Sequence, residues 1–293
     1  MRILFIGAVA FSARALHELL AMQAEVVGVC TLRQAAFNAD HADLTPIAEQ
    51  ACIPVCHAPD LHNPEVISWI HERKPDIIFC FGWSRLIRPS LLTLPRLGVI
   101  GFHPAALPAN RGRHPLIWAL VLGLTETAST FFFMDEGADS GDILSQVSVP
   151  IVPEDDAGRL YERITEVALE QIRDFVPRLA NSSFRRQPQD GRFANVWRKR
   201  GAADGQIDWR MAAESIHNLV RGLTRPYVGA HFDHSGEEIK VWRTEVEPNV
   251  AMNLEPGKIL AVDERGILIK AGIGGIRLLE TAPKVALHVG SYL

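Results

Sequence analysis

The sequence predicts an α/β protein with a mostly parallel sheet covered by helices, followed by a smaller all-β domain. Three observations support this prediction. In the first two-thirds of the chain, short apolar runs rich in β-branched residues alternate with stretches of helical character. A long amphipathic stretch then precedes a polar, basic segment, and the last ninety or so residues contain several short strand-like runs separated by turn signals.

The parallel sheet is predicted from five apolar runs, each bounded by a turn or by the start of a helix. Thr45 before Pro46 and Asn63 before Pro64 supply the N-cap and first-turn residues that begin two of the intervening helices. The predicted strands are 3–6, 26–30, 77–81, 99–102 and 130–134.

A long helix over residues 156–180 should close the first domain, because its apolar residues recur at helical spacing and can pack on the sheet. The segment after it is polar, contains glycines and carries six basic side chains, which indicates a solvated connector. We therefore expect a first domain over 1–180, a connector over 181–203 and a second domain over 204–293. The second domain should begin with an amphipathic helix and continue as the strands of a small barrel, 239–242, 259–262, 267–271 and 276–281.

Composition excludes several classes of protein. The chain has 293 residues, of which 47% are hydrophobic and 22% charged, as in an ordinary globular protein. No apolar stretch approaches the roughly 18 residues of a membrane span, so we expect a cytoplasmic protein without a membrane partner. The net charge of -4 argues against general nucleic-acid binding. The four cysteines lack the spacing of a zinc site, and we expect buried reduced thiols and no bound metal.

Two glycine-bounded loops, 101–115 and 134–142, carry the residues most suited to catalysis. His103 follows a predicted strand directly, at the edge where open α/β sheets build their sites. An imidazole can take the proton that an attacking amine loses and can donate to an oxyanion, while Asp139 could orient and charge it. The alternative is structural: His103 would cap its strand and Asp139 would form a turn before Gly141. The joint occurrence of the two loops favours an acyl-transfer site.

The two loops resemble the signature of the folate-dependent formyltransferases, in which Asn-x-His-x-x-x-Leu-Pro-x-x-Arg-Gly precedes Asp-x-Gly-x-Asp-x-Gly. The resemblance extends to 81–87 and to the second-domain runs 204–209, 216–221 and 226–230. It implies a Rossmann-like domain followed by an oligonucleotide-binding (OB)-like barrel, with N10-formyltetrahydrofolate as the co-substrate. It also implies catalysis by His103 and Asp139, and folate binding by Leu86, Ile87, Asp135, Gly137 and Asp139.

The chain departs from this family at Gly101, where the family has an asparagine that helps to hold the formyl oxygen. Losing one such donor typically costs about 10²- to 10³-fold in rate. We hypothesise that His114, Asn110 or a bound water occupies the vacated space. A non-catalytic binding protein with the same fold remains the alternative from another class.

The acceptor is predicted to be the amine of a nucleotide-linked amino sugar used in surface-glycan synthesis. Enzymes of this family that act on initiator methionyl-tRNA carry a basic loop after the second strand, whereas residues 31–45 here hold one arginine and two aspartates. Arg111, Arg113 and His114 are the candidate substrate-binding residues, since arginines suit a diphosphate. Methionyl-tRNA is the alternative acceptor, supported by the basic connector. The oligomeric state stays open, with a homodimer as one option.

Overall fold

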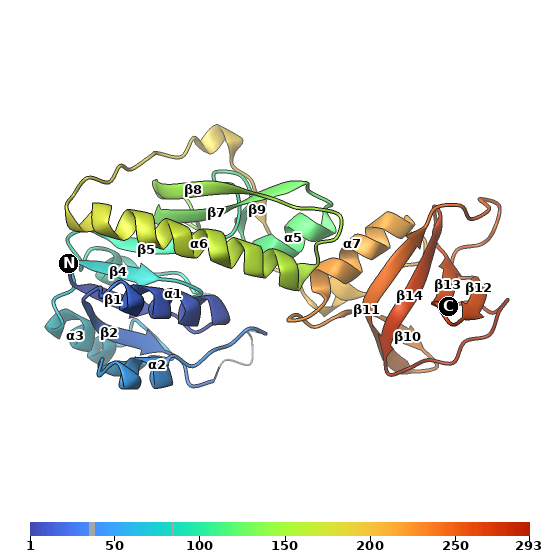
Figure 1. Ribbon diagram of the computed structural model, residues 1–293, viewed down its shortest axis with the longest axis horizontal. Coiled ribbons are helices and arrows are strands. Elements are labelled where there is room, and N and C mark those ends of the chain that lie inside the picture. The colour runs from blue at the N-terminus through green and yellow to red at the C-terminus, as the bar shows by residue number, and fades with distance from the viewer. Residues whose placement is uncertain (35–38, 84) are drawn as a thin grey trace. The chain divides into compact units, whose positions relative to one another are not determined.

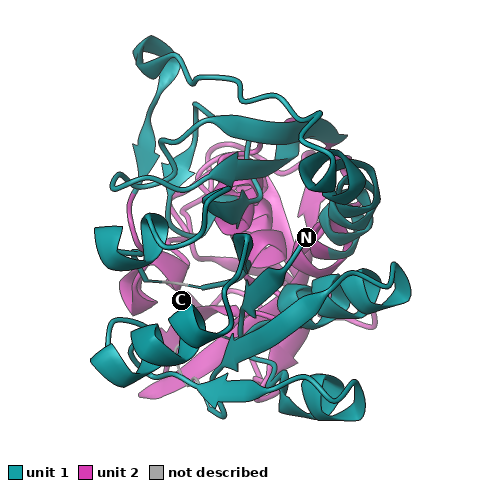
Figure 2. Ribbon diagram, turned by 90° about the vertical axis from the view of Figure 1, so that its left-hand side faces the viewer, with its two compact units in different colours: residues 1–115, 127–149, 162–197 teal, residues 116–126, 150–161, 198–293 magenta. Residues whose placement is uncertain are grey.

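The computed structural model describes residues 1–34, 39–83 and 85–293 (Figure 1). The chain divides into two compact units, shown in Figure 2. The first comprises residues 1–115, 127–149 and 162–197, and the second comprises 116–126, 150–161 and 198–293. These limits differ from the predicted ones, because short segments 116–126 and 150–161 join the second unit and most of the predicted connector joins the first.

The first unit is built on a seven-stranded sheet in the order β3-β2-β1-β4-β5-β7-β8. The pairs from β3 to β5 are parallel, and β7 runs antiparallel to β5, so the mostly parallel α/β fold is confirmed. The strands are β1 (Ile3–Ile6), β2 (Val26–Thr31), β3 (Val55–His57), β4 (Ile77–Cys80), β5 (Val99–His103), β7 (Glu126–Phe133) and β8 (Ile143–Pro150). Strands β3 and β8 were not predicted, since β3 has only three residues and much of β8 is exposed and polar.

Helices cover both faces of this sheet (Figure 1). Phe79 of β4 packs edge-on against Phe175 of the long helix, and Phe81 contacts Phe11, so two helices share one face. Residues that alternate with Phe79, such as Ile78 and Cys80, point to the opposite face. Helix α5 (Pro115–Val121) lies almost wholly in the second unit, where Ile117 joins the core. The helices of the first unit are α1 (Ala10–Ala21), α2 (Thr45–Gln50), α3 (Pro64–Glu72), α4 (Pro89–Leu92) and α6 (Ala157–Ala180). The last of these confirms the helix predicted over 156–180.

The predicted connector folds onto the first unit instead of forming a solvated linker. Strand β9 (Val196–Trp197) pairs in parallel with β6 (Arg111–Gly112), a two-residue strand inside the first glycine-bounded loop. A short 3₁₀ helix, Gly191–Phe193, precedes it. Local composition predicts that a charge-rich segment is solvated, because a pairing partner far away in the sequence leaves no local signal. Backbone pairing places residues 196–197 beside the first glycine-bounded loop.

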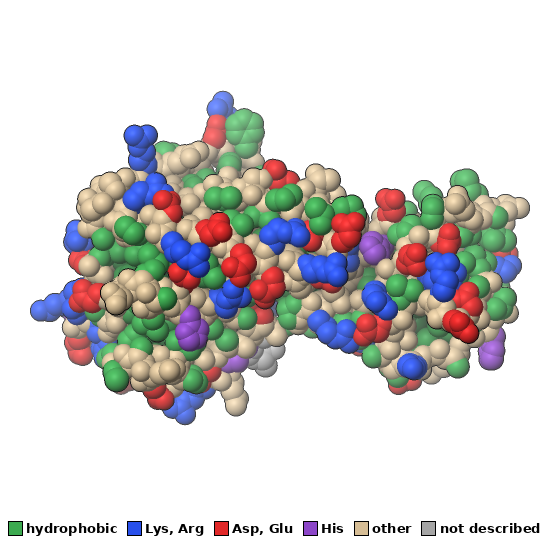
Figure 3. Space-filling model, viewed as in Figure 1, with side chains coloured by type: hydrophobic (Ala, Val, Ile, Leu, Met, Phe, Trp, Pro, Cys, Tyr) green, Lys and Arg blue, Asp and Glu red, His purple; other side chains and the backbone are tan. Residues whose placement is uncertain are grey.

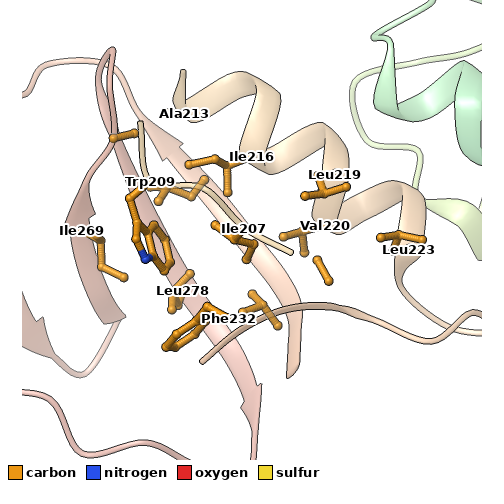
Figure 4. Close-up of a cluster of buried hydrophobic side chains, with 14 of the residues drawn as sticks. Ile207, Trp209, Ala213, Ile216, Leu219, Val220, Leu223, Phe232, Ile269 and Leu278 are labelled. Carbon is orange, nitrogen blue, oxygen red and sulfur yellow. The ribbon is translucent and has the colours of Figure 1, made fainter. Parts of the chain in front are cut away.

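The second unit is a five-stranded antiparallel sheet covered by one helix, α7 (Ala213–Leu223). A second 3₁₀ helix, Ala202–Gly205, precedes α7. Figure 4 shows Ile216, Leu219 and Val220 of α7 directed toward Trp209, Phe232 and Leu278. The described strands include no pair between the edge strands β10 and β12, which leaves the sheet open, as in partly open five-stranded barrels. The strands are β10 (Ala230–His234), β11 (Glu237–Glu247), β14 (Gly275–Ala282), β13 (Gly266–Lys270) and β12 (Ile259–Asp263), in spatial order.

Two expectations from composition can be compared with the structure. Within the described ranges, no helix is both long and apolar enough to cross a membrane. All four cysteines are unpaired, but only Cys30 and Cys80 are buried, while Cys56 is half-buried and Cys52 is exposed. The expectation of four buried thiols is therefore wrong for two of them, because apolar neighbours in the sequence did not place those residues in the core.

Candidate functional site

The structure brings His103 and Asp139 together. His103 is the last residue of β5, and Asp139 lies in the turn that follows the neighbouring strand β7. The Nδ1 atom of His103 is 3.7 Å from Oδ2 of Asp139, and only 5% of His103 is exposed. A nearly buried imidazole facing a carboxylate at the edge of a sheet has the arrangement needed for proton transfer.

The hydrogen bonds of the histidine assign its tautomer. Nε2 of His103 lies 2.7 Å from the backbone oxygen of Asn110. A carbonyl oxygen only accepts, so Nε2 carries the hydrogen and donates it to Asn110. Nδ1 is then the nitrogen that can take up or release a proton, and it is the one that faces Asp139.

The turn of Asp139 is closely constrained. Asp139 has a positive φ of 55°, which a non-glycine residue seldom adopts, and its Oδ2 accepts a hydrogen bond of 2.8 Å from the Gly112 amide. At the start of the turn, Asp135 Oδ1 accepts from the Gly137 amide at 3.0 Å and from Ser140 Oγ at 2.7 Å. These bonds hold the carboxylate of Asp139 against the imidazole.

An aromatic ring, not a polar side chain, lies over Gly101. Gly101 is paired across the sheet with Phe132. A Cβ atom at Gly101 would lie 2.9 Å from Cζ of Phe132 and 3.0 Å from Cγ of Met134. These carbon atoms are the nearest neighbours of the position where the family asparagine begins. Cross-strand pairing brings the Phe132 ring there. The hypothesis that His114, Asn110 or a bound water replaces that asparagine stays a prediction.

The candidate substrate-binding residues lie on and after β6. The guanidinium of Arg111 donates to Oε1 of Gln189 from Nη2 at 2.7 Å and from Nε at 3.2 Å. The amide of Arg113 donates to the backbone oxygen of Trp197 at 3.0 Å, and His114 has a φ of 55°. All three side chains are half-buried.

Sequence reasoning missed two residues of this site, Gln189 and Asn195. Besides accepting from Arg111, Gln189 donates from Nε2 to the backbone oxygens of Asp139 and Gly141, at 2.9 and 2.7 Å. Asn195 Oδ1 accepts from the Asn110 amide at 2.7 Å. Both lie in the predicted connector, where nothing in the local pattern distinguishes a polar residue with a long-range partner from a solvated one.

The predicted folate-binding loop follows β4, on the other side of β5. Leu86 is 64% exposed and its carbonyl lies 3.3 Å from Nε2 of His62, while Ile87 is buried. Because β4 and β7 flank β5, a folate held by Leu86 and by the Asp135 to Asp139 turn would lie against His103. An exposed apolar side chain opposite a polar turn suits a bicyclic ring with polar edges, so these residues fit the co-substrate.

A cavity of about 250 Å³ lies at the carboxyl ends of β2 and β3. Its cationic and titratable lining comes from Arg33, His57 and Arg85, and the last of these directly precedes Leu86. No cluster of three or more potential metal ligands of the His, Cys, Asp and Glu types occurs within the described ranges.

Comparisons with known proteins agree with this arrangement. Residues 1–175 match the family model described as formyl transferase, and residues 200–292 match that of its C-terminal domain. The chain is 33% identical over 284 residues to a methionyl-tRNA formyltransferase of Geobacter metallireducens, covering 96% of this chain and 90% of the relative. A methionyl-tRNA formyltransferase of Acetivibrio thermocellus is 30% identical, with 96% and 91% covered.

Solved structures share the fold at lower identity. WlaRD, a sugar 3N-formyl transferase crystallised with dTDP and 5-N-formyl-tetrahydrofolate, superposes with a TM-score of 0.72 at 16% identity, covering 97% of this chain and 99% of that one. HypX from Aquifex aeolicus in complex with tetrahydrofolic acid gives a TM-score of 0.70 at 20% identity, covering 96% of this chain and 44% of that one. The family matches, which span both units, together with the converging loops show that this chain belongs to the formyl transferase family, as an N-formyltransferase that uses N10-formyltetrahydrofolate.

Proposed function

We propose that this enzyme formylates the amine of a nucleotide-linked amino sugar, a modification of the precursors of surface glycans. His103 and Asp139 are its catalytic pair. Leu86, Ile87, Asp135, Gly137 and Asp139 hold the folate. Arg111, Arg113 and His114 form the acceptor side of the site.

The observation that carries this proposal is the conformation of the segment after β2. The amide of Ala10 donates to the backbone oxygen of Asp40 at 2.8 Å, and that of Ala42 donates to Ala8 at 3.0 Å. His41 adds contacts to the backbone oxygens of Ala8, at 2.9 Å, and Arg33, at 3.2 Å. Residues 40–42 are thus bound along the turn between β1 and α1. The run 39–45 carries two aspartates and no lysine or arginine. Such a segment is poorly suited to contact RNA phosphates.

The distribution of charge supports a small acceptor. On the face shown in Figure 3, basic and acidic side chains are interspersed, and several form ion pairs such as Arg173 with Glu18. Arg33 and Arg85 line a cavity of about 250 Å³, a size that suits the anionic group of a small molecule, and Arg85 also donates to the backbone oxygen of Pro59. Two N-formyltransferases of the same fold were crystallised with dTDP or with dTDP-3-aminofucose.

The proposed mechanism assigns the proton to one atom of the enzyme. N10-formyltetrahydrofolate supplies an electrophilic formyl carbon when it is bound. Nδ1 of His103 takes up the proton that the attacking amine loses, since Nε2 is already bonded to Asn110. The carboxylate of Asp139, 3.7 Å away, then stabilises the imidazolium. The imidazolium would return this proton to the folate nitrogen as the bond from that nitrogen to the formyl carbon breaks, which leaves the histidine neutral for the next turnover. The low exposure of His103 keeps bulk water from competing for that proton.

A second acceptor, methionyl-tRNA, is favoured by the curated relatives. The chain is 30 to 33% identical to methionyl-tRNA formyltransferases over nearly its whole length. The exposed arginines of 181–203 could contribute phosphate contacts.

The decisive assay measures formyl transfer from labelled N10-formyltetrahydrofolate to a panel of nucleotide-linked amino sugars and to methionyl-tRNA. We expect turnover with a sugar and none with tRNA, and no salt-sensitive gel shift with tRNA. His103→Gln should lower kcat by about 10²- to 10⁴-fold, whereas His17→Gln, on the exposed side of α1, should not change it. Preferential formylation of tRNA would replace the proposed acceptor, and absence of turnover with either acceptor would identify a binding protein.

A further inference from the structure

Gln189, in the segment after α6, uses its whole side-chain amide on the two catalytic loops. Its oxygen accepts two hydrogen bonds from the Arg111 guanidinium, and its nitrogen donates to the backbone oxygens of Asp139 and Gly141. A primary amide has two hydrogens to donate and one oxygen to accept with. Gln189 therefore uses both donor hydrogens on the loop of Asp139 and its acceptor oxygen on the loop of Arg111.

The loops that Gln189 joins carry the catalytic pair. Residues 110–112 contact the pair twice, because the Asn110 oxygen accepts from His103 and the Gly112 amide donates to Asp139. Arg111 lies between those two residues. Any shift of the Asp139 turn relative to Arg111 must break bonds to Gln189, so the 3.7 Å approach of Asp139 to His103 depends on this amide.

The Asp139 turn requires such support. Asp139 holds a left-handed backbone conformation, with φ at 55°, which is unfavourable for a residue with a side chain unless the surroundings stabilise it. Its own backbone oxygen and that of Gly141 are the atoms that Gln189 binds. Gln189 is half-buried, which limits the competition of water for these bonds.

We propose that Gln189 is a positioning residue for formyl transfer, which holds the Asp139 turn in register with His103 by joining it to Arg111. This inference rests on the proposed catalytic role of the pair. It assigns a function in the reaction to the segment between the two family domains.

The test compares Gln189→Met, which keeps the length of the side chain but removes its amide, with Gln187→Met as the matched control. Gln187 is exposed and pairs with Ile143 through its backbone. We expect Gln189→Met to lower kcat about 10- to 100-fold with a smaller change in KM, and to alter the pH profile of kcat. Amide hydrogen exchange at 139–141 should become faster. Gln187→Met should change none of these quantities.

Gln189→Glu provides a second variant if Gln189→Met does not fold. It keeps one oxygen that accepts from Arg111, but its other carboxylate oxygen faces the carbonyl oxygens of Asp139 and Gly141 and cannot donate to them. We therefore expect the same decrease in kcat and the same faster exchange. Unchanged exchange at 139–141, or faster exchange with a kcat equal to that of the wild type, would overturn the proposal. The exchange comparison needs no acceptor, so it distinguishes failure of this proposal from failure of the proposed function.

Discussion

At the scale of single residues, Gly101 is where this chain differs most from its family. The family resemblance implies an asparagine there that helps to hold the formyl oxygen, and here Phe132 and Met134 carbons lie at the Cβ position. Neither side chain can donate a hydrogen bond from those atoms. The surroundings of residue 101 are therefore more apolar than the family motif implies.

The single variant Gly101→Asn should be destabilised and no more active, because its Cβ would meet Phe132 at 2.9 Å. Overpacking of this kind costs about 1–3 kcal/mol, which urea denaturation would measure. Adding Phe132→Leu should make room and raise kcat by about 10²-fold, the usual value of one oxyanion donor. The control is Gly101→Leu with Phe132→Leu, which has the same shape without the amide. Equal kcat for the two double variants would show that a donor at this position contributes nothing.

At the scale of secondary-structure elements, the pairing of β6 with β9 organises the site. The pairing brings the side chain of Asn195 to the Asn110 amide, which donates a hydrogen bond to it. The Gly112 amide does not take part in the pairing and donates to Asp139. Gly112 has a φ of +103°, and a Cβ atom there would lie 2.3 Å from the backbone oxygen of Trp197. Only glycine fits this position.

Gly112→Ala should therefore separate β6 from β9 and lower kcat by at least about 10-fold, as expected when a catalytic group is displaced by roughly 1 Å. Steady-state kinetics, together with hydrogen exchange at 111–113, would measure both effects. Gly191→Ala is the matched control, since a Cβ atom at Gly191 meets nothing within 4 Å. An active Gly112→Ala enzyme with slow exchange at 111–113 would contradict the organising role of the pairing.

At the scale of the whole molecule, the two compact units each have a hydrophobic core, and an ion pair between Arg198 and Asp204 lies at the start of the last segment of the second unit. Asp204 accepts a hydrogen bond from Arg198 and another, of 2.7 Å, from the Gly201 amide. The bond from Arg198 lowers the pKa of the Asp204 carboxyl most, and the bond from Gly201 lowers it further, so this pKa lies well below its usual range. A carboxylate whose pKa is lower in the folded state stabilises that state at pH values above its unfolded pKa of about 4.

Asp204→Asn should accordingly lower the Tm of the second unit at pH 7, and the difference from wild type should shrink as the pH falls from about 4 toward the lower folded pKa. Scanning calorimetry of the two proteins over this pH range would measure the difference in Tm. Asp208→Asn is the comparison. The pKa of Asp208 is about 2 because Arg210 donates to it, but both side chains are largely exposed, so the effect should be smaller. A Tm difference for Asp204→Asn that does not change with pH would contradict this account.

The sequence alone determined the class of the fold and the family, and it named His103 and Asp139 as the proposed catalytic pair. Apolar β-branched runs predicted five of the seven strands of the first sheet, and helical spacing predicted α6. Both predictions succeeded because the spacing of apolar residues reflects which side of a helix or strand is buried. His103 and Asp139 could be named because each lies in a short motif beside a strand end. Local pattern did not distinguish the strand β9 from a linker or indicate that Cys52 is exposed.

Only the tertiary structure decided how these parts form a site. The 3.7 Å approach of His103 to Asp139, the ring of Phe132 over Gly101, and the bonds from Gln189 and Asn195 all join residues distant in the sequence. Asn110 and Asn195, for example, are 85 positions apart. Such contacts depend on strand order and cross-strand register, which follow from the packing of the whole sheet and not from any one segment.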